Sequence, residues 1–315
     1  MSGILVIKFG ALGDMVQATG PFAAIRKHHA GEALTLLTTP PYVALARALQ
    51  LFDDIWDDGR PKSLVAQLRL IARLRRARFD RVYDLQTSQR SSFLLQALWP
   101  RRPEWSGIAR GATHPHANPR RDFLHTIERQ AEQLRIAGVP IEAAPPNLSA
   151  LAAREAARLT KFALPEPYAL LVPGGSPHRP GKRWPAQSYA ALAARLAQEG
   201  LTPAIIGGPP EREIAETILA AAPGARSLVG QTDFLDILAL GSRAALAVGN
   251  DTGPMHLIAA AGAPALVLFG RESDPVLCAP RGANVHILRP DLLAALPVED
   301  VVAAMARLPA GGAGK

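Results

Sequence analysis

The sequence contains a single cysteine, Cys278, so no intrachain disulfide and no cluster of cysteine metal ligands can form. Aromatic residues are few, at 5% of the chain, and no familiar nucleic-acid-binding module is present, which disfavours a nucleic-acid-binding protein. No apolar run approaches the ~18 residues that a bilayer-spanning helix needs. The short apolar start is followed by Lys8 and Asp14, unlike a signal peptide. These absences predict a cytoplasmic protein.

Acidic residues are too few to balance the basic ones, and the imbalance lies in one half of the chain. The formal net charge is +8. Residues 1–148 hold 20 Lys and Arg against 13 Asp and Glu, whereas residues 149–315 hold 15 against 14. This asymmetry favours an anionic partner for the first half, such as nucleic acid, a lipid head group or a phosphorylated glycan. Solvated arginine faces explain the charge equally well.

The composition is that of a globular protein with two domains. Hydrophobic residues make up 48% and charged residues 20% of the 315 positions, which excludes a disordered chain. At roughly 150 residues per domain, two domains are expected. The stretch Glu142–Leu148 has two prolines and no periodicity. We therefore place the linker there and predict domains at residues 1–148 and 149–315.

Short apolar runs alternate with amphipathic stretches in both halves. In the first half, the patterns predict strands at Ile4–Phe9, Leu34–Thr38 and Arg81–Leu85, helices at Asp14–His29, Tyr42–Leu51, Leu64–Arg78, Ser91–Trp99 and Thr126–Ala137, and a long loop over residues 100–121. In the second half they predict strands at Tyr168–Val172, Ala204–Ile206, Leu246–Gly249, Ala265–Phe269 and Val285–Leu288, and helices at Ala186–Gln198, Arg212–Ala221, Asp233–Leu240, Pro254–Ala261 and Val298–Arg307. Such alternation predicts two α/β domains with doubly wound parallel sheets, which bind ligands outside the C-terminal strand ends.

The first candidate motif, Gly10-Ala11-Leu12-Gly13-Asp14, follows the first predicted strand. It lacks the third glycine of the dinucleotide fingerprint, and no fitting acid follows the second strand, so a nicotinamide dehydrogenase is disfavoured. Asp14 can act either as a helix N-cap or as a general base aimed into a cleft.

The second motif joins Pro173-Gly174-Gly175-Ser176 to Gly181-Lys182-Arg183-Trp184-Pro185. It differs from a P-loop, because five residues separate Gly175 from Gly181 and Arg183 stands where the magnesium-binding hydroxyl would be. A glycine turn, a lysine and a helix N-terminus nevertheless suit a phosphate. The alternative is a surface loop with solvated cations.

The third motif, Gly249-Asn250-Asp251-Thr252-Gly253-Pro254-Met255-His256, also joins a strand to a helix. Pro254 suits the first helical turn, and the N–H groups of Thr252 and Gly253 could hold a diphosphate. In the alternative interpretation, Asp251 or Thr252 caps the helix and His256 is a packed histidine.

These motifs together resemble the family 9 glycosyltransferases, the heptosyltransferases of lipopolysaccharide core assembly. The matching segments are KFGALGD near the start, PGGS and GKRWP in the middle, and GNDTGPMHLIAAAGAPALVLFG near the end. The resemblance runs from about Ile4 to Arg307, and the third segment is its most specific part. Asp84-Leu85-Gln86 with Arg90, and Gly207 to Glu211, also look like family stretches.

The resemblance implies a GT-B fold, in which two Rossmann-like domains face each other across a cleft and the C-terminal helix Val298–Arg307 returns to pack on the first domain. It implies inverting transfer of a heptose from an ADP-activated donor to a lipopolysaccharide-core or related lipid-linked glycan. The second domain would hold the nucleotide sugar and the first domain the anionic acceptor, at the inner face of the cytoplasmic membrane. No metal or cofactor would be obligatory.

The resemblance also implies roles for residues. Asp14 would be the base, and Lys182 would stabilise the departing diphosphate. The donor would be held by Gly13, Gly175, Ser176, Glu211, Asp251, Thr252, Gly253 and His256. The acceptor's carboxylate or phosphate would be bound by Arg90, with help from Arg110, Arg120 and Arg121.

Two departures leave the substrates open. Residues Ser106–Asn118 do not match the family's acceptor loop, so the acceptor and the sugar can differ. His114 and His116 have no third ligand nearby in sequence, and we interpret them as loop or substrate contacts. Three alternatives remain: a GT-B transferase or epimerase for another nucleotide sugar, a nucleic-acid-binding protein, and a non-catalytic sugar-nucleotide sensor.

Overall fold

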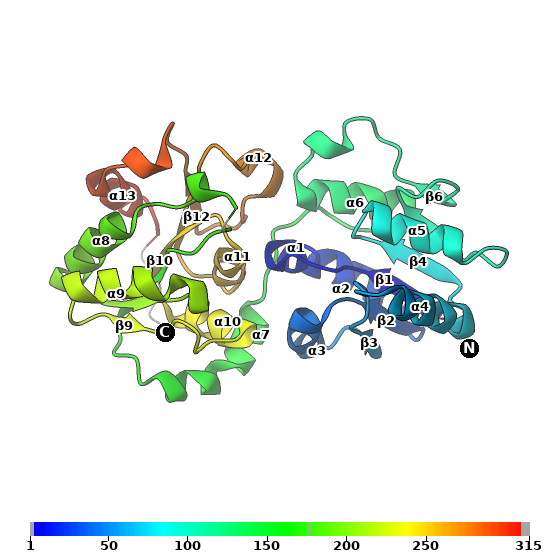
Figure 1. Ribbon diagram of the computed structural model, residues 1–315, viewed down its shortest axis with the longest axis horizontal. Helices are drawn as coiled ribbons and strands as arrows, with labels where there is room; N and C mark the ends of the chain where they lie inside the picture. Colours follow the sequence, from blue (N-terminus) through cyan, green and yellow to red (C-terminus); the bar gives the residue numbers. More distant parts are fainter. Residues whose placement is uncertain (1–2, 177, 310–315) are drawn as a thin grey trace. The chain divides into compact units, whose positions relative to one another are not determined.

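The computed structural model describes residues 3–176 and 178–309. The chain divides into two compact units, Met1–Ala144 and Pro145–Lys315, each built around its own buried core (Figure 1). The boundary predicted between residues 148 and 149 falls just inside the second unit.

The first unit contains a six-stranded parallel sheet with the order β3-β2-β1-β4-β5-β6. Its strands are β1 Gly3–Ile7, β2 Ala33–Leu37, β3 Asp54–Trp56, β4 Arg81–Asp84, β5 Glu104–Gly107 and β6 His114–Pro115. Its helices are α1 Leu12–Gln17, α2 Thr19–His28, α3 Val43–Leu49, α4 Leu64–Ala77, α5 Gln89–Ala97 and α6 Thr126–Ile136. This is the order of a Rossmann-type sheet, in which winding reverses between β1 and β4.

Buried apolar residues explain the central position of β1. Its residues 4–7 are buried, as expected for a parallel strand covered by helices on both faces. In the ladders, Ile7 pairs with Leu37 on one side and with Asp84 on the other. The segments that follow β1 and β4 therefore start side by side at the carboxyl edge of the sheet.

The sequence prediction for the first unit was wrong in three places. The predicted loop over residues 100–121 contains β5 and β6, because a four-residue strand in a stretch rich in Pro and Arg is too short to show periodicity. Strand β3 also escaped prediction. The predicted helix Asp14–His29 is divided into α1 and α2 at Ala18. Pro21 explains the division, since it has no N–H to donate to the carbonyl of Gln17.

The second unit repeats the same strand order. Its parallel sheet runs β12-β11-β10-β7-β8-β9, so that β7 and β10 flank the reversal point. Its strands are β7 Tyr168–Val172, β8 Thr202–Ile205, β9 Arg226–Ser227, β10 Leu246–Asn250, β11 Ala265–Leu268 and β12 Val285–Leu288. Its helices are α7 Ser149–Arg154, α8 Ala186–Gln198, α9 Arg212–Ala221, α10 Phe234–Arg243, α11 Gly253–Ala260, α12 Pro275–Cys278 and α13 Val298–Met305. The short elements α7, β9 and α12 were not predicted.

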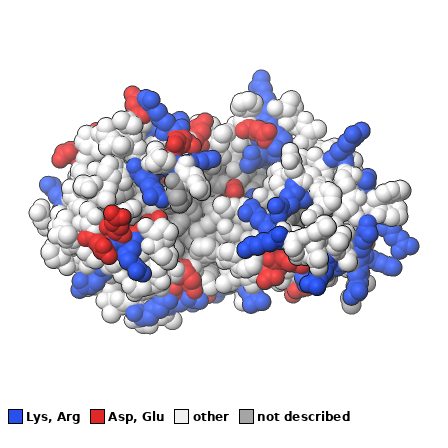
Figure 2. Space-filling view, in the orientation of Figure 1, with Lys and Arg blue, Asp and Glu red and all other residues white. Residues whose placement is uncertain are grey.

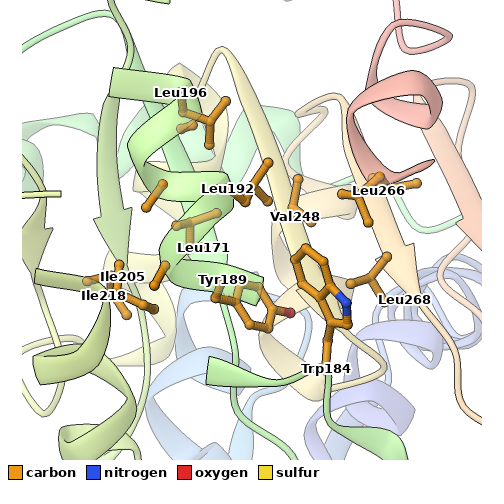
Figure 3. Close-up of a cluster of buried hydrophobic side chains, with 14 of the residues drawn as sticks. Leu171, Trp184, Tyr189, Leu192, Leu196, Ile205, Ile218, Val248, Leu266 and Leu268 are labelled. Carbon is orange, nitrogen blue, oxygen red and sulfur yellow. The ribbon is translucent and has the colours of Figure 1, made fainter. Parts of the chain in front are cut away.

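A continuous apolar core fixes α8 on the sheet of the second unit. Figure 3 shows Leu192 and Leu196 of α8 near Leu171 and Val248 of the strands. At the start of α8, the rings of Trp184 and Tyr189 meet edge to face, with their centroids 4.9 Å apart. This packing anchors the loop that precedes α8.

The last helix belongs to the core of the second unit. Helix α13 contacts α8 and β12, and its Val301 and Ala304 are buried in the same apolar cluster. The buried face of α13 thus packs on the second unit. Packing of this helix on the first unit stays a prediction. In the part of the chain that the structure describes, no helix has both the length and the apolar character needed to cross a bilayer.

Candidate active site

A cavity of about 460 Å³ lies at the reversal point of the second unit. It is bounded by the loops that follow β7, β8 and β10, where ligands of doubly wound sheets bind. Seven of the residues predicted to act on the donor line it: Gly175, Ser176, Lys182, Glu211, Asp251, Thr252 and Gly253. Apolar side chains, including Ile206, Phe234 and Ile237, complete the wall. Charged and apolar surfaces therefore meet in one cavity.

Asn250, at the end of β10, holds the loops of this cavity together. The residue is fully buried. Its Oδ1 accepts hydrogen bonds from the Trp184 amide at 3.1 Å and the Tyr189 hydroxyl at 3.0 Å. Its Nδ2 donates to the carbonyls of Pro173 at 2.8 Å and Gly174 at 3.0 Å. One side-chain amide thus joins the second motif to the third, a role that the sequence analysis missed.

Lys182 and Asp251 form a partly shielded ion pair within the cavity wall. Lys182 Nζ lies 2.6 Å from Asp251 Oδ2, and their side chains are only 12% and 8% exposed. The same carboxylate oxygen accepts a 2.6 Å hydrogen bond from Ser273 Oγ. Ser273 in turn lies 3.7 Å from the Cys278 sulfur. In this structure, Asp251 balances the lysine charge that was predicted to face a diphosphate.

The N-terminus of α11 opens into the same cavity. Thr252 is the N-cap residue, with extended backbone, and no side chain caps the helix within the described residues. Thr252, Gly253 and Pro254 all line the cavity. The first N–H groups of a helix carry partial positive charge, so this helix start and Lys182 provide two independent attractions for an anion.

Glycine is required where two loops of the cavity touch. A Cβ atom on Gly270, after β11, would lie 1.9 Å from the carbonyl oxygen of Gly181. A Cβ on Gly249 would lie 2.6 Å from the sulfur of Met255. These contacts let the lysine loop and α11 approach the sheet more closely than any side chain allows.

Glu211 forms the opposite wall of the cavity. The side chain is 9% exposed, and its Oε2 accepts a 2.8 Å hydrogen bond from the Gly208 amide. A Cβ on Gly207 would lie 2.8 Å from the Cβ of Glu211, so glycine makes room for the acid. The carboxylate is thus fixed in the cavity wall, and its role toward the donor stays a prediction.

Two predicted donor residues are not among those lining the cavity. His256 is buried on α11, with 7% exposure. Gly13 lies on α1 in the first unit, next to Asp14. Their roles toward the donor stay predictions.

Asp14 occupies the first turn of α1, at the reversal point of the first unit. Its Oδ2 accepts a hydrogen bond at 3.2 Å from the backbone amide of Ala11, which is the N-cap residue. Asp14 is therefore the third residue of the helix and not its N-cap, and its carboxylate binds the amide of the cap residue. The side chain is nevertheless partly exposed. Gly10 has φ +103°, and a Cβ there would lie 2.4 Å from the Tyr42 ring, which explains the glycine that starts this turn.

A buried acid and a buried lysine lie behind Asp14 at the same edge of the sheet. Asp84 Oδ1 accepts the amides of Gln86 and Thr87, at 3.1 and 2.9 Å. Burial raises the pKa of Asp84 to about 6, although these amides and Lys8 oppose the rise. Lys8 Nζ donates to the carbonyl of Leu85 at 3.1 Å, and burial lowers the pKa of Lys8 while Asp14 opposes that shift.

One of the predicted acceptor arginines, Arg121, contacts a residue of the loop after β4. Arg121 Nη2 donates to Thr87 Oγ1 at 3.2 Å, and its Nη1 lies 2.6 Å from Asp122. Arg90, Arg110 and Arg120 are exposed and have no ion pair among the described residues. The structure thus separates Arg121 from the other three by burial.

Arg129 on α6 is a member of this cluster that the sequence analysis missed. Burial, followed by the charge of Arg121, lowers its pKa, and the charge of Asp14 opposes this. Asp14 and Arg121 therefore each lie within electrostatic range of Arg129. The signal available in sequence was an arginine on the inner face of an amphipathic helix.

The histidines of the 100–121 segment have separate partners. His116 Nε2 lies 2.9 Å from Glu132 Oε2, and His114 Nε2 lies 3.7 Å from Glu104. Within residues 3–176 and 178–309, no group of three His, Cys, Asp or Glu side chains is arranged to hold a metal ion.

Comparison with known proteins agrees with this architecture. Residues 67–299 match the model of glycosyltransferase family 9 (heptosyltransferase). A lipopolysaccharide heptosyltransferase 2 of Salmonella typhimurium is 26% identical over 312 residues, covering 91% of this chain and 87% of that protein. The structure of Escherichia coli ADP-heptose lps heptosyltransferase II superposes with a TM-score of 0.80 at 21% identity, covering 97% of this chain and 99% of that one. A second E. coli heptosyltransferase, solved with ADP, gives 0.76 at 20% identity, covering 95% and 98%.

Each of these two solved chains covers both Rossmann-like units, which establishes the predicted GT-B type of fold. The family model spans the site loops of the second unit, from the lysine motif to α11. The chain is a glycosyltransferase and belongs to family 9, the heptosyltransferases.

Proposed function

We propose that this protein transfers a heptose, with inversion, from an ADP-activated donor to a lipopolysaccharide-core or related lipid-linked glycan. The observation that carries the proposal is the convergence of Lys182 and the uncapped N-terminus of α11 on one cavity at the reversal point of the second unit. A similar structure is described as a heptosyltransferase with ADP, and a relative is named for lipopolysaccharide.

In this proposal the cavity holds the donor by its charged and polar walls. The amides at Thr252 and Gly253, with Ser176 and the Gly175 turn, bind the diphosphate. Glu211 accepts hydrogen bonds from ribose hydroxyls, and Phe234 and Ile237 cover an apolar part of the donor. Asp251 contacts the sugar, and His256 supports the phosphate site from within α11.

Asp14 acts as the general base. Its carboxylate takes the proton of an acceptor hydroxyl while the hydroxyl oxygen attacks the anomeric carbon. The bond between that carbon and the diphosphate oxygen breaks, and ADP leaves with the electron pair. Lys182 and the helix amides stabilise the negative charge on the leaving group, so the step needs no obligatory metal or cofactor.

The first unit binds the anionic acceptor. Arg129 lies within electrostatic range of Asp14, and Arg121 lies within electrostatic range of Arg129, so these two are the best-placed cations for a carboxylate or phosphate. Arg90, Arg110 and Arg120, which are exposed, extend the cationic surface. The lipid-linked acceptor implies peripheral association with the inner face of the cytoplasmic membrane and no nucleic-acid partner.

Calorimetric titration with ADP, UDP and GDP tests the donor. We expect ADP to bind at least about tenfold more tightly than the other two, because a site that hydrogen-bonds adenine would leave its polar groups unpaired against other bases. A preference for UDP would instead support a transferase or epimerase acting on another nucleotide sugar.

A second experiment tests the base. Asp14→Asn should keep ADP affinity and lose at least about a hundredfold in turnover, which is the usual range for general-base removal. Asn retains an oxygen that can accept the Ala11 amide, so the helix cap is preserved. Equal turnover in variant and wild type would remove Asp14 from this role and would also favour a non-catalytic sensor.

A further inference from the structure

Exposed apolar side chains concentrate in one stretch of the first unit. Among the described residues, ten large hydrophobic side chains are exposed, and five of them lie between residues 64 and 99. These five, which we name the α4–α5 patch, are Leu64, Val65, Leu68, Phe93 and Trp99. Their exposure ranges from 47% for Phe93 to 71% for Leu64, so residues 3–176 and 178–309 leave this surface uncovered.

The patch follows the outer face of α4 and continues onto the end of α5. Leu64 and Leu68 are one helical turn apart, and Arg75 continues the same row. Arg75 Nη2 donates to the carbonyl of Ala97 at 2.6 Å and lies 3.4 Å from that of Trp99. The inner faces of both helices are buried in one core, through Leu70, Leu74, Leu94 and Leu95. The exposed residues therefore form one outward surface.

Basic residues surround the patch. Lys62, Arg69, Arg76, Arg78 and Arg101 are all exposed and form no ion pair within the described residues. A hollow of about 580 Å³ at the ends of α4 and α5 is lined by Arg75, Arg78, Arg101, Arg102 and Trp99, together with Asp80 and Glu104. Glu104 is already paired with Arg81. Figure 2 shows Lys and Arg side chains gathered over the end of the first unit that carries α4.

We propose that the α4–α5 patch is the surface by which this protein lies on an anionic lipid bilayer. Leucine and valine side chains would enter the boundary between head groups and acyl chains, where tryptophan is also favoured. The long arginine side chains would reach lipid phosphates while their aliphatic stems cover apolar surface. This inference rests on the proposed lipid-linked acceptor, for which it names the docking surface.

The charge pattern favours a bilayer over other partners. In a symmetric dimer, the same arginines would face one another, and like charges at an interface oppose association. Single-stranded nucleic acid is bound by rows of aromatic side chains on which successive bases stack, whereas three of the five patch side chains, Leu64, Val65 and Leu68, are aliphatic. An anionic bilayer offers acyl chains to the apolar side chains and phosphates to the basic ones.

The direction of α4 relates the patch to the acceptor side of the first unit. Helix α4 follows β3, so it starts near the carboxyl edge of the parallel sheet, where Asp14 and Asp84 lie. Leu64 and Leu68 are at this end of the helix. A lipid whose tail stays in the bilayer would therefore present its glycan at the edge that carries the proposed base.

Vesicle flotation tests the docking surface. Wild-type protein should float with phosphatidylcholine vesicles that contain about 30% phosphatidylglycerol, and much less with phosphatidylcholine alone, because each surface cation adds to binding of anionic lipid. Leu64→Ser/Leu68→Ser and Trp99→Ala should each weaken binding severalfold. Arg69→Glu/Arg76→Glu should weaken it at least about tenfold and remove its salt dependence.

Matched controls separate the patch from general surface effects. Leu292 is 59% exposed in the second unit, so Leu292→Ser removes an equally exposed leucine elsewhere and should leave flotation unchanged. Arg226→Glu/Arg307→Glu makes the same change in charge on the second unit and should have a much smaller effect. Thermal unfolding of every variant checks that the first unit is folded, and ADP titration checks that the donor site in the second unit is intact.

Four results would overturn the inference. Wild-type protein could fail to float with anionic vesicles, or the patch variants could float as well as wild type. The patch variants could instead abolish a dimer in sedimentation, or abolish binding to single-stranded RNA without changing flotation. Because flotation needs no donor, a failed docking surface with normal ADP binding is distinguishable from a failure of the proposed function.

Discussion

Lys182 and Asp251 neutralise each other in this structure, although the proposed function requires the lysine to face a diphosphate. The negative charge of Asp251 repels the phosphates of a nucleotide that carries no sugar, such as ADP. Removing the charge of Asp251 should therefore change the affinity of the cavity for an anionic nucleotide.

Asp251→Asn should tighten ADP binding by about five- to tenfold, because the lysine charge is no longer balanced while the amide oxygen can still accept from Lys182 and Ser273. Calorimetry at low and high salt measures the change. Asp274→Asn is the matched control, since it removes an exposed carboxylate on the loop after β11, next to Ser273. Unchanged or weaker ADP binding in Asp251→Asn would show that the acid does not oppose the phosphate.

Asp84 makes a pH-dependent contribution to stability. Its pKa is raised to about 6 by burial, so the folded state binds a proton more tightly than the unfolded state does. The contribution of Asp84 to the free energy of unfolding is therefore fully present below about pH 4 and is lost as the pH rises through about 6. At roughly 1.4 kcal/mol per pKa unit, the loss amounts to about 2 to 3 kcal/mol.

Asp84→Asn should lack this loss, so that wild type weakens relative to the variant between about pH 4 and pH 7.5. Urea unfolding at several pH values measures the difference. Asp80→Asn, which removes an exposed acid four residues earlier, should follow the wild-type profile. Parallel profiles for wild type and Asp84→Asn would contradict the raised pKa.

At the scale of elements, the site depends on loops that touch without side chains between them. The lysine loop passes Gly270 at the end of β11, and Asn250 ties the loop after β7 to the start of α8. The position of Lys182 is therefore set by the ends of several strands rather than by its own loop alone.

Gly270→Ala should move the lysine loop and weaken ADP binding at least about tenfold, because its Cβ would lie 1.9 Å from the Gly181 carbonyl oxygen. The strands beneath do not change, so the protein should still fold, with a melting temperature lower by several degrees. Gly224→Ala is the control, since no atom lies within 4 Å of its added Cβ. Normal ADP affinity in Gly270→Ala would mean that the loop adapts freely.

Sequence patterns predicted the long elements and the loops at strand ends well, because buried strands such as β7 and amphipathic helices such as α8 and α9 carry strong periodicity. They could not predict β5 or the division at Ala18, where a short strand and a single proline decide the structure. They also placed Asp251 and Lys182 in one site without showing that the two side chains pair. Asn250 was missed because it binds the carbonyl of Pro173, 77 residues away. Arg129 was missed because its partner Asp14 lies on a different helix at the other end of the unit's sequence.

For the whole molecule, the two units have separate cores and carry separate parts of the proposed site. A ligand that binds the cavity of the second unit stabilises that unit by mass action, by about 2.7 kcal/mol at a concentration one hundred times its dissociation constant.

When ADP is bound, amide hydrogen exchange should therefore slow most in the loops after β7 and β10 and in α11. The exchange rates of β1 and β4 in the first unit should change little. Mass spectrometry of peptides from both units measures this. UDP at the same concentration serves as the control nucleotide. Equal protection of both units by ADP would show that the nucleotide does not act through the second unit alone.

The position of the single thiol has a practical consequence. Cys278 lies 3.7 Å from Ser273, whose hydroxyl binds the carboxylate of Asp251. A fluorophore coupled to this one sulfur would attach at a unique point without any engineered cysteine. Its emission would respond to rearrangements around Asp251, so arrival and departure of nucleotide could be followed in real time by stopped flow.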